Sequence, residues 1–139
     1  MTPFELVRLV HVLCAVLGLG LIAAVGLVAR SERSAASPPS ELLSLSRWST
    51  AALGVMMGTG MLLNVLSGGT YHHAWWFRLS AISLVATGAV VGFTRRRARR
   101  WIAGEVDASA ARRYVVSMSW AACGLVAWIT ALMELRPFQ

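Results

Sequence analysis

Several polar or ionisable side chains that could take part in chemistry lie inside long apolar stretches, where such groups are rare. Arg8 and His11 lie in the first stretch, Asn64 lies near the end of the second, Arg78 opens the third and Glu134 lies near the end of the fourth. Ionisable groups in helices that cross a membrane face the bundle interior or water, and they tend to pair. We therefore expect a polar cluster of Asn64, Arg78 and Glu134, with Arg8 as the other candidate partner for Glu134. A simpler interpretation is that this pair fixes the helix ends while the arginines reach the interface.

His11 is the sharpest of these residues, because a neutral imidazole can ligate haem iron or copper. Met57 and Met61 point in a direction similar to that of Asn64, and a thioether is a suitable axial ligand for haem or a ligand for Cu(I). Arg8 and Arg78 lie at a comparable depth and could neutralise haem propionates. The alternative is that His11 hydrogen-bonds a neighbouring helix and the methionines fill gaps in the packing. We favour this alternative, because only one imidazole lies within the apolar stretches.

The remaining candidates for chemistry are weaker. His72 and His73 fall in a loop, where solvation explains them. Cys14 and Cys123 lie in apolar stretches, where packing is the simpler role than redox chemistry. The sequence contains no glycine-rich phosphate loop, no CxxC pair and no HExxH motif. No reaction can be assigned from these residues alone.

Four apolar stretches of roughly the 20 residues needed to span a bilayer must position these groups. They cover residues 4–29, 42–66, 74–94 and 110–135 of the 139-residue chain. The first is longer than the apolar part of a signal peptide, so we expect it to be retained. We expect the third to continue through the arginine run and to stop near Gly104. The fold class expected is all-α: one domain, an integral membrane antiparallel four-helix bundle.

Charge indicates how this bundle is oriented. All thirteen basic residues are arginine, hydrophobic residues make up 57% of the chain, and 14% of residues are charged. Ten arginines flank one side of the stretches and three the other, so the positive-inside rule puts both termini on the non-cytoplasmic side. We expect a multi-pass protein of the bacterial inner membrane. The run Arg95–Arg100 predicts contact with anionic lipid headgroups of the bilayer, in preference to nucleic acid.

Small residues spaced four apart predict close helix packing, within the bundle or between subunits. On the first stretch, Arg8, His11, Ala15, Gly18, Ile22, Gly26 and Ala29 share one narrow face. The second carries Gly54 and Gly58. The third has two faces that we expect to be enclosed: one holds Arg78, Ala81, Val85, Gly88 and Gly92, and the other holds the hydroxyls of Ser80, Ser83, Thr87 and Thr94. Tyr71–Phe77 is typical of an aromatic belt at a membrane surface.

Short segments also resemble a known group of proteins. Leu6–Leu13 resembles the K-x-L-H-V-L opening of small bacterial four-helix membrane proteins related to the CopD and HemJ families. Gly58–Leu63 resembles their T-G-L-L-L, Trp75–Leu79 their W-x-x-K-L with Arg78 in place of lysine, and Leu132–Pro137 their closing L-M-V-F-K-P. HemJ proteins are haem-b-associated enzymes that oxidise protoporphyrinogen IX, and CopD proteins are linked to copper uptake. The resemblance implies that His11 is the matching axial ligand.

Three functional hypotheses follow. The first is a non-catalytic accessory or ligand-binding component of a membrane assembly, with other membrane subunits or further copies of the chain as partners. The second is a haem-b-binding redox protein or a HemJ-like oxidase, with His11 as axial ligand, Met61 or Met57 as its partner, and Arg8 and Arg78 near the propionates. The third is a copper-handling protein that uses His11, Met57, Met61 and Cys14.

Overall fold

Each apolar stretch forms one long helix. The computed structural model describes residues 2–31 and 39–135, apart from the side chain of Glu134. The helices are α1 (Pro3–Arg30), α3 (Glu41–Leu66), α4 (Trp75–Ile102) and α5 (Ala108–Leu135), and the described part of the chain contains no strand. All four are long and apolar enough to cross a membrane. As expected, α4 runs through the arginine run, and Gly104 follows it with a φ of 72°.

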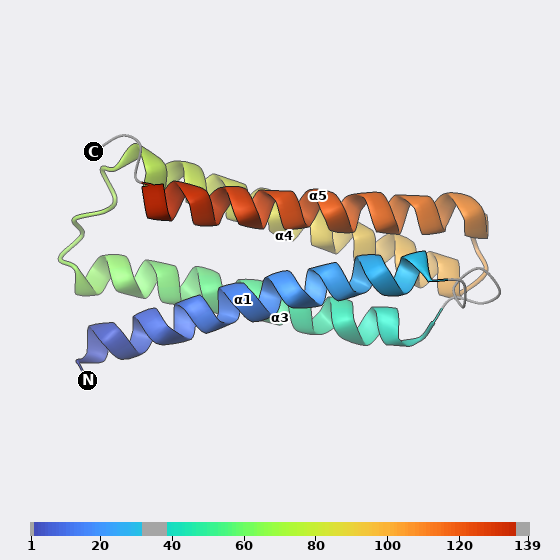
Figure 1. Ribbon diagram of the computed structural model, residues 1–139, viewed down its shortest axis with the longest axis horizontal. Coiled ribbons are helices and arrows are strands. Elements are labelled where there is room, and N and C mark those ends of the chain that lie inside the picture. The colour runs from blue at the N-terminus through green and yellow to red at the C-terminus, as the bar shows by residue number, and fades with distance from the viewer. Residues whose placement is uncertain (1, 32–38, 136–139) are drawn as a thin grey trace.

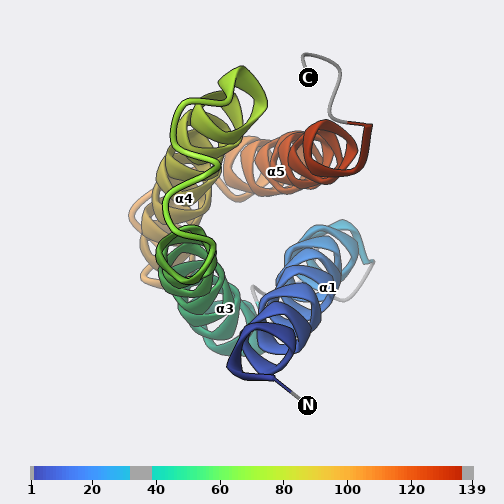
Figure 2. The same cartoon turned by 90° about the vertical axis from the view of Figure 1, so that its left-hand side faces the viewer.

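The helices run antiparallel and form a ring in chain order. Figure 1 shows the starts of α1 and α4 at one end of the bundle with the ends of α3 and α5, and both chain termini lie at that end. Seen along the bundle in Figure 2, α1 contacts α3 and α5, and α4 contacts the same two helices. We call the end that carries the termini the terminal end. The opposite end, where the arginine run lies, is the arginine end.

The helix ends are held by local hydrogen bonds. At the start of α1, the Thr2 hydroxyl accepts from the Glu5 N–H at 3.2 Å, and the Glu5 carboxylate accepts from the Thr2 N–H at 2.7 Å. This reciprocal capping box satisfies two N–H groups that have no partner within the helix. At the start of α5, the Asp107 carboxylate accepts from the Ser109 hydroxyl and from the Ala110 N–H, and these bonds lower its pKa.

The carbonyls at the end of α1 are capped from another helix. Arg112 of α5 donates from Nε to the Ala29 carbonyl at 3.0 Å, and its Nη2 donates to the carbonyls of Arg30 and Ser31. The last carbonyls of a helix receive no hydrogen bond from an N–H group of the same helix, so a guanidinium from elsewhere is a suitable donor to them. Arg112 therefore ties α1 to α5 at the arginine end.

The core consists of two clusters along the bundle. One, in the middle, contains Ile22 of α1, Met56 of α3, Leu84 of α4 and Ile129 of α5. The other, at the arginine end, is built around Leu42, Trp101 and Val115. On α1 the predicted face is buried at His11, Gly18, Ile22, Gly26 and Ala29.

The hydroxyl face predicted for α4 is buried: Ser80, Ser83, Thr87 and Thr94 are all at most 8% exposed. The second face expected to be enclosed on this helix is not. Ala81, Val85 and Gly92 are exposed and Gly88 is half-buried. Small residues occur on outward-facing as well as inward-facing helix surfaces, so the small size of these residues alone does not predict that they are buried. The outer surface of the ring is strongly apolar, with Val16, Ile82 and Phe93 each at least 60% exposed.

The contact between α1 and α5 depends on the absence of a side chain at Gly26. A Cβ built there would lie 3.1 Å from the Cβ of Ser119, tighter than ordinary van der Waals contact. We therefore expect Gly26→Val to separate the two helices and to lower the free energy of unfolding by about 1–3 kcal/mol. SDS titration of the purified protein in mixed micelles measures this loss. Gly20→Val is the control on the same helix, because nothing lies within 4 Å of a Cβ at Gly20. Equal losses at both positions would contradict the proposed close contact.

Candidate functional site

His11 is buried between α1 and α3, about 12 Å along α1 from its first residue. Its Nδ1 lies 2.9 Å from the hydroxyl oxygen of Thr59 on α3. The next residue, Gly60, makes room for the ring, because a Cβ there would lie 3.3 Å from the His11 Cε1. The site therefore consists of the His11 imidazole packed against Thr59 and Gly60 of the neighbouring helix.

The Thr59 hydroxyl fixes which ring nitrogen of His11 carries the proton. That hydroxyl lies 2.8 Å from the carbonyl of Val55 and 3.1 Å from that of Met56, and its single proton is donated to its own helix. In the contact with His11 it must therefore accept, so Nδ1 carries the proton and donates. Nε2 then keeps its lone pair and can act as an acceptor. This arrangement resembles that of many metal-binding histidines, in which the other nitrogen donates to a fixed acceptor.

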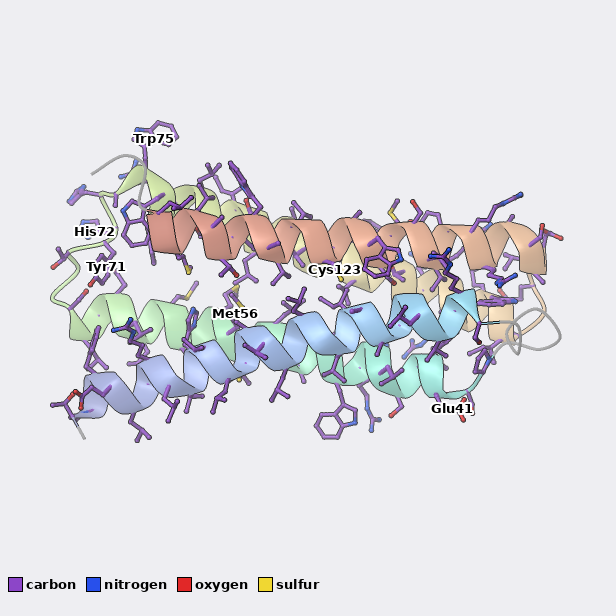
Figure 3. All side chains as sticks on the ribbon, viewed as in Figure 1. Glu41, Met56, Tyr71, His72, Trp75 and Cys123 are labelled. Atoms are coloured by element: carbon purple, nitrogen blue, oxygen red, sulfur yellow. The ribbon has the colours of Figure 1, made fainter. Side chains whose placement is uncertain are left out.

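The two predicted methionines do not join His11 in the interior. Met57 is 41% exposed and Met61 is 57% exposed, whereas their neighbour Met56 is 2% exposed and packs in the central core. Figure 3 shows Met56 on α3 at the side facing the other helices. Successive helix residues are about 100° apart, so a face that presents Met56 and Thr59 inward turns Met57 and Met61 outward. Met57 and Met61 do share the direction of Asn64, but Asn64 is only half-buried and lies at the edge of the inward face.

Asn64 and Arg78 hold the loop that joins α3 to α4. The Asn64 side-chain oxygen accepts from the Tyr71 N–H at 3.2 Å. Arg78 is exposed, and its Nε donates to the His72 carbonyl at 3.0 Å. Arg8 is also exposed, on α1 at the same end of the bundle. The side chain of Glu134 lies outside the described residues, and so do the pairs predicted for it.

The aromatic segment at the terminal end has both outward and inward members. Trp75 is 70% exposed and points away from the bundle (Figure 3), whereas Trp76 is 8% exposed and its ring centroid lies 5.5 Å from that of Tyr71. The ring centroids of His72 and His73 lie 3.7 Å apart with the rings tilted at 46°, and the His72 Nδ1 is hydrogen-bonded to the Gly69 carbonyl. These two histidines thus make contacts within the loop itself.

No group of three His, Cys, Asp or Glu side chains that could hold a metal ion occurs among the residues that the structure describes. Cys14 and Cys123 are free thiols, both half-buried and packed against the central core. His11 is consequently the one predicted ligand that is both buried and positioned by a second residue. Thr59, which positions it, was missed from sequence; the only signal was its place in the segment Gly58–Leu63.

The six glycines predicted to pack helices fall into two groups. Gly18 and Gly26 are buried on α1, and a Cβ at Gly18 would lie 3.6 Å from that of Ala52. At the other four, a Cβ would have no atom of another described helix within 4 Å; they are Gly54, Gly58, Gly88 and Gly92. Within a single chain, therefore, only the first group brings helices together.

The arginine run covers the opposite end of the bundle. Arg96 and Arg99 are exposed, Arg97 lies over the Tyr114 ring at 5.9 Å, and Arg100 pairs with Glu105 at 3.2 Å. An exposed ion pair of this kind contributes little to stability. The exposed guanidiniums leave this end strongly positive.

The bond from His11 to Thr59 can be tested directly. We expect ¹⁵N NMR of the His11 ring to show the tautomer with the proton on Nδ1 in the wild type. Thr59→Val removes the acceptor, so the preference should be lost, with a fall of about 1–3 kcal/mol in the free energy of unfolding. Thr70→Val is the control, since Thr70 is exposed in the loop at the terminal end. An unchanged His11 spectrum in Thr59→Val would refute the assignment.

The chain was compared with protein-family models, curated proteins and solved structures, and none of them matches it. The resemblance to CopD and HemJ proteins thus stays a prediction from the segments that carry it.

Proposed function

We propose that this chain is a multi-pass membrane protein of the bacterial inner membrane that works as a non-catalytic subunit, packing against other membrane helices or further copies of itself. The observation that carries this proposal is the pair of glycine faces on α3 and α4. Gly54 and Gly58 lie four residues apart on α3, and Gly88 and Gly92 lie four apart on α4. A Cβ at any of them would have no atom of another described helix within 4 Å.

Glycines at this spacing allow close approach of helix backbones in lipid, where van der Waals contact drives association. Within the chain, single glycines eight residues apart on α1 allow a similar close approach, Gly18 to α3 and Gly26 to α5. On α3 and α4 the pairs of glycines four residues apart form an outward-facing contact surface. A partner helix from another chain would complete it.

The orientation proposed from the arginine count is consistent with this role. Both termini lie at one end and the arginine run at the other (Figure 1). With the arginine end in the cytoplasm, Arg96 and Arg99 are exposed to the anionic headgroups of the inner leaflet, each contributing about 1 kcal/mol of attraction. The terminal end, with its loop of aromatic residues and His11 beneath, faces the other side.

The assembly role predicts that bulk on the outward glycine faces disrupts association. Replacing Gly54 and Gly58 together by leucine should leave the fold intact and reduce the associated fraction in lipid nanodiscs by at least about half, because the backbones can no longer approach. Subunit counting by single-molecule photobleaching measures copies of the chain, and quantitative cross-linking in the native membrane measures other subunits.

Gly124→Leu is the matched control for this test. Gly124 also has nothing within 4 Å of a Cβ, but it lies between the exposed Trp120 and Trp128 on α5, which prevent close approach. A wild type that is monomeric and free of cross-linked partners would overturn the proposal. An equal reduction of the associated fraction in the Gly54/Gly58 variant and in the Gly124 control would also overturn it.

Haem binding is the second candidate, and the state of His11 favours it. Its Nε2 has a lone pair and its other nitrogen is fixed by Thr59, which suits an axial ligand. Met57 and Met61 turn outward, so neither of these two predicted second ligands lies beside it. The set of His11, Met57, Met61 and Cys14 does not converge either, so the residues present do not fit the copper site first considered.

The haem hypothesis predicts a Soret band in protein purified from haem-replete cells. His11→Ala should abolish the band because it removes the axial ligand, and Thr59→Val should shift or weaken it by freeing the ring. His73→Ala, in the exposed loop, should leave the spectrum unchanged. A wild type that stays colourless after incubation with excess haemin would exclude the cofactor and leave the assembly proposal standing.

A further inference from the structure

A small cavity lies between the four helices, at the level where α1 approaches α5. It offers about 10 Å³ to the centres of water molecules, and each of the four helices contributes two residues to its wall. Half of these eight residues carry hydroxyls: Ser46 and Ser49 of α3, Thr94 of α4 and Ser119 of α5. The other four are apolar.

Among the residues that the structure describes, two of these hydroxyls have no hydrogen-bond partner. Ser46 and Ser119 are each 3% exposed, and their Oγ atoms are fully enclosed. Buried hydroxyls are almost always hydrogen-bonded, to protein or to ordered water. An unpartnered hydroxyl that lines a cavity therefore indicates that a water molecule or another small polar group completes it.

The other two hydroxyls are acceptors that still have capacity. Ser49 donates its proton to the Ser46 carbonyl at 2.9 Å, and Thr94 donates to the Val90 carbonyl at 2.7 Å. A hydroxyl that has donated its one proton keeps lone pairs that can accept. The cavity thus presents two free donors and two acceptors.

We propose that this cavity is a binding site for a single ordered water molecule that links α3, α4 and α5. The water accepts from Ser46 and Ser119 and donates to Ser49 and Thr94, which uses its full hydrogen-bonding capacity. The volume agrees, because one water needs about 10–15 Å³ of such space and two to four polar partners. A cation is disfavoured, since no acidic side chain lines the cavity and Arg95 directly follows Thr94.

The sign of a serine-to-alanine effect distinguishes a hydrated cavity from a dry one. If water is bound, Ser46→Ala and Ser119→Ala each remove a hydrogen bond, and each should lower the ratio of folded to unfolded protein in an SDS titration by about 2- to 10-fold. If the cavity is dry, each change removes an unsatisfied hydroxyl, and the ratio should rise. Because both serines hold the same water, the double variant should lose less than the product of the single losses.

Ser80→Ala is the matched control. Ser80 is 1% exposed and its hydroxyl also lacks a partner, but it does not line this cavity. Its replacement should leave the ratio unchanged or raise it. Equal losses at all three serines, independent losses at Ser46 and Ser119, or gains at both would each overturn the proposal.

A structure of the wild type in lipid at a resolution that shows water gives the direct test. One density peak is expected within about 2.5–3.0 Å of the Ser46 and Ser119 hydroxyl oxygens. The peak should be absent in Ser46→Ala/Ser119→Ala. An empty cavity in the wild type would overturn the proposal irrespective of the stability measurements.

Discussion

The close approach of α1 to α5 at Gly26 and Ser119 closes the ring of helices, and much of the structure depends on it. These two helices are the first and last in the chain, so no loop holds them together. The missing side chain at Gly26 lets Ser119 sit against the α1 backbone, and Arg112 caps the carbonyls of α1 one turn further on. Their combined effect is to fix the arginine end, and it is there that the buried hydroxyls enclose a cavity.

The terminal end is organised differently. Figures 1 and 2 show α1 and α5 farther apart there than at the arginine end. Here α1 is held mainly by α3, through His11, Thr59 and Gly60, and the α3–α4 loop is held by Asn64 and Arg78. Polar residues that looked like one cluster therefore serve two separate purposes. Of these residues, His11 is the one that can still bind a proton or a metal, because its hydrogen bond to Thr59 involves Nδ1 and leaves the lone pair on Nε2.

The outward faces connect this architecture to the proposed role. Contact with lipid requires only that the outer surface be apolar. The glycines of α3 and α4 also leave the helix backbone uncovered by side chains, which lipid contact does not require. Glycines bring α1 close to its neighbours at Gly18 and Gly26, and the glycines of α3 and α4 offer a similar close approach to a partner. The polar features of the interior, His11 near one end and the hydrated cavity near the other, are separate from those faces, so assembly and any internal chemistry can be tested independently.

Long apolar stretches and repeated hydroxylated positions are properties of a single helix. The sequence alone therefore predicts four helices, their approximate limits, most of the buried face of α1 and the buried hydroxyl face of α4. It did not determine whether Gly54, Gly58, Gly88 and Gly92 face inward, or that Met56 rather than Met57 or Met61 enters the core. In a chain whose helices are apolar on every side, periodicity gives the angle between residues but not which direction meets a neighbour. Only the tertiary packing decided that, and with it the bond from His11 to Thr59 and the cavity between Ser46 and Ser119.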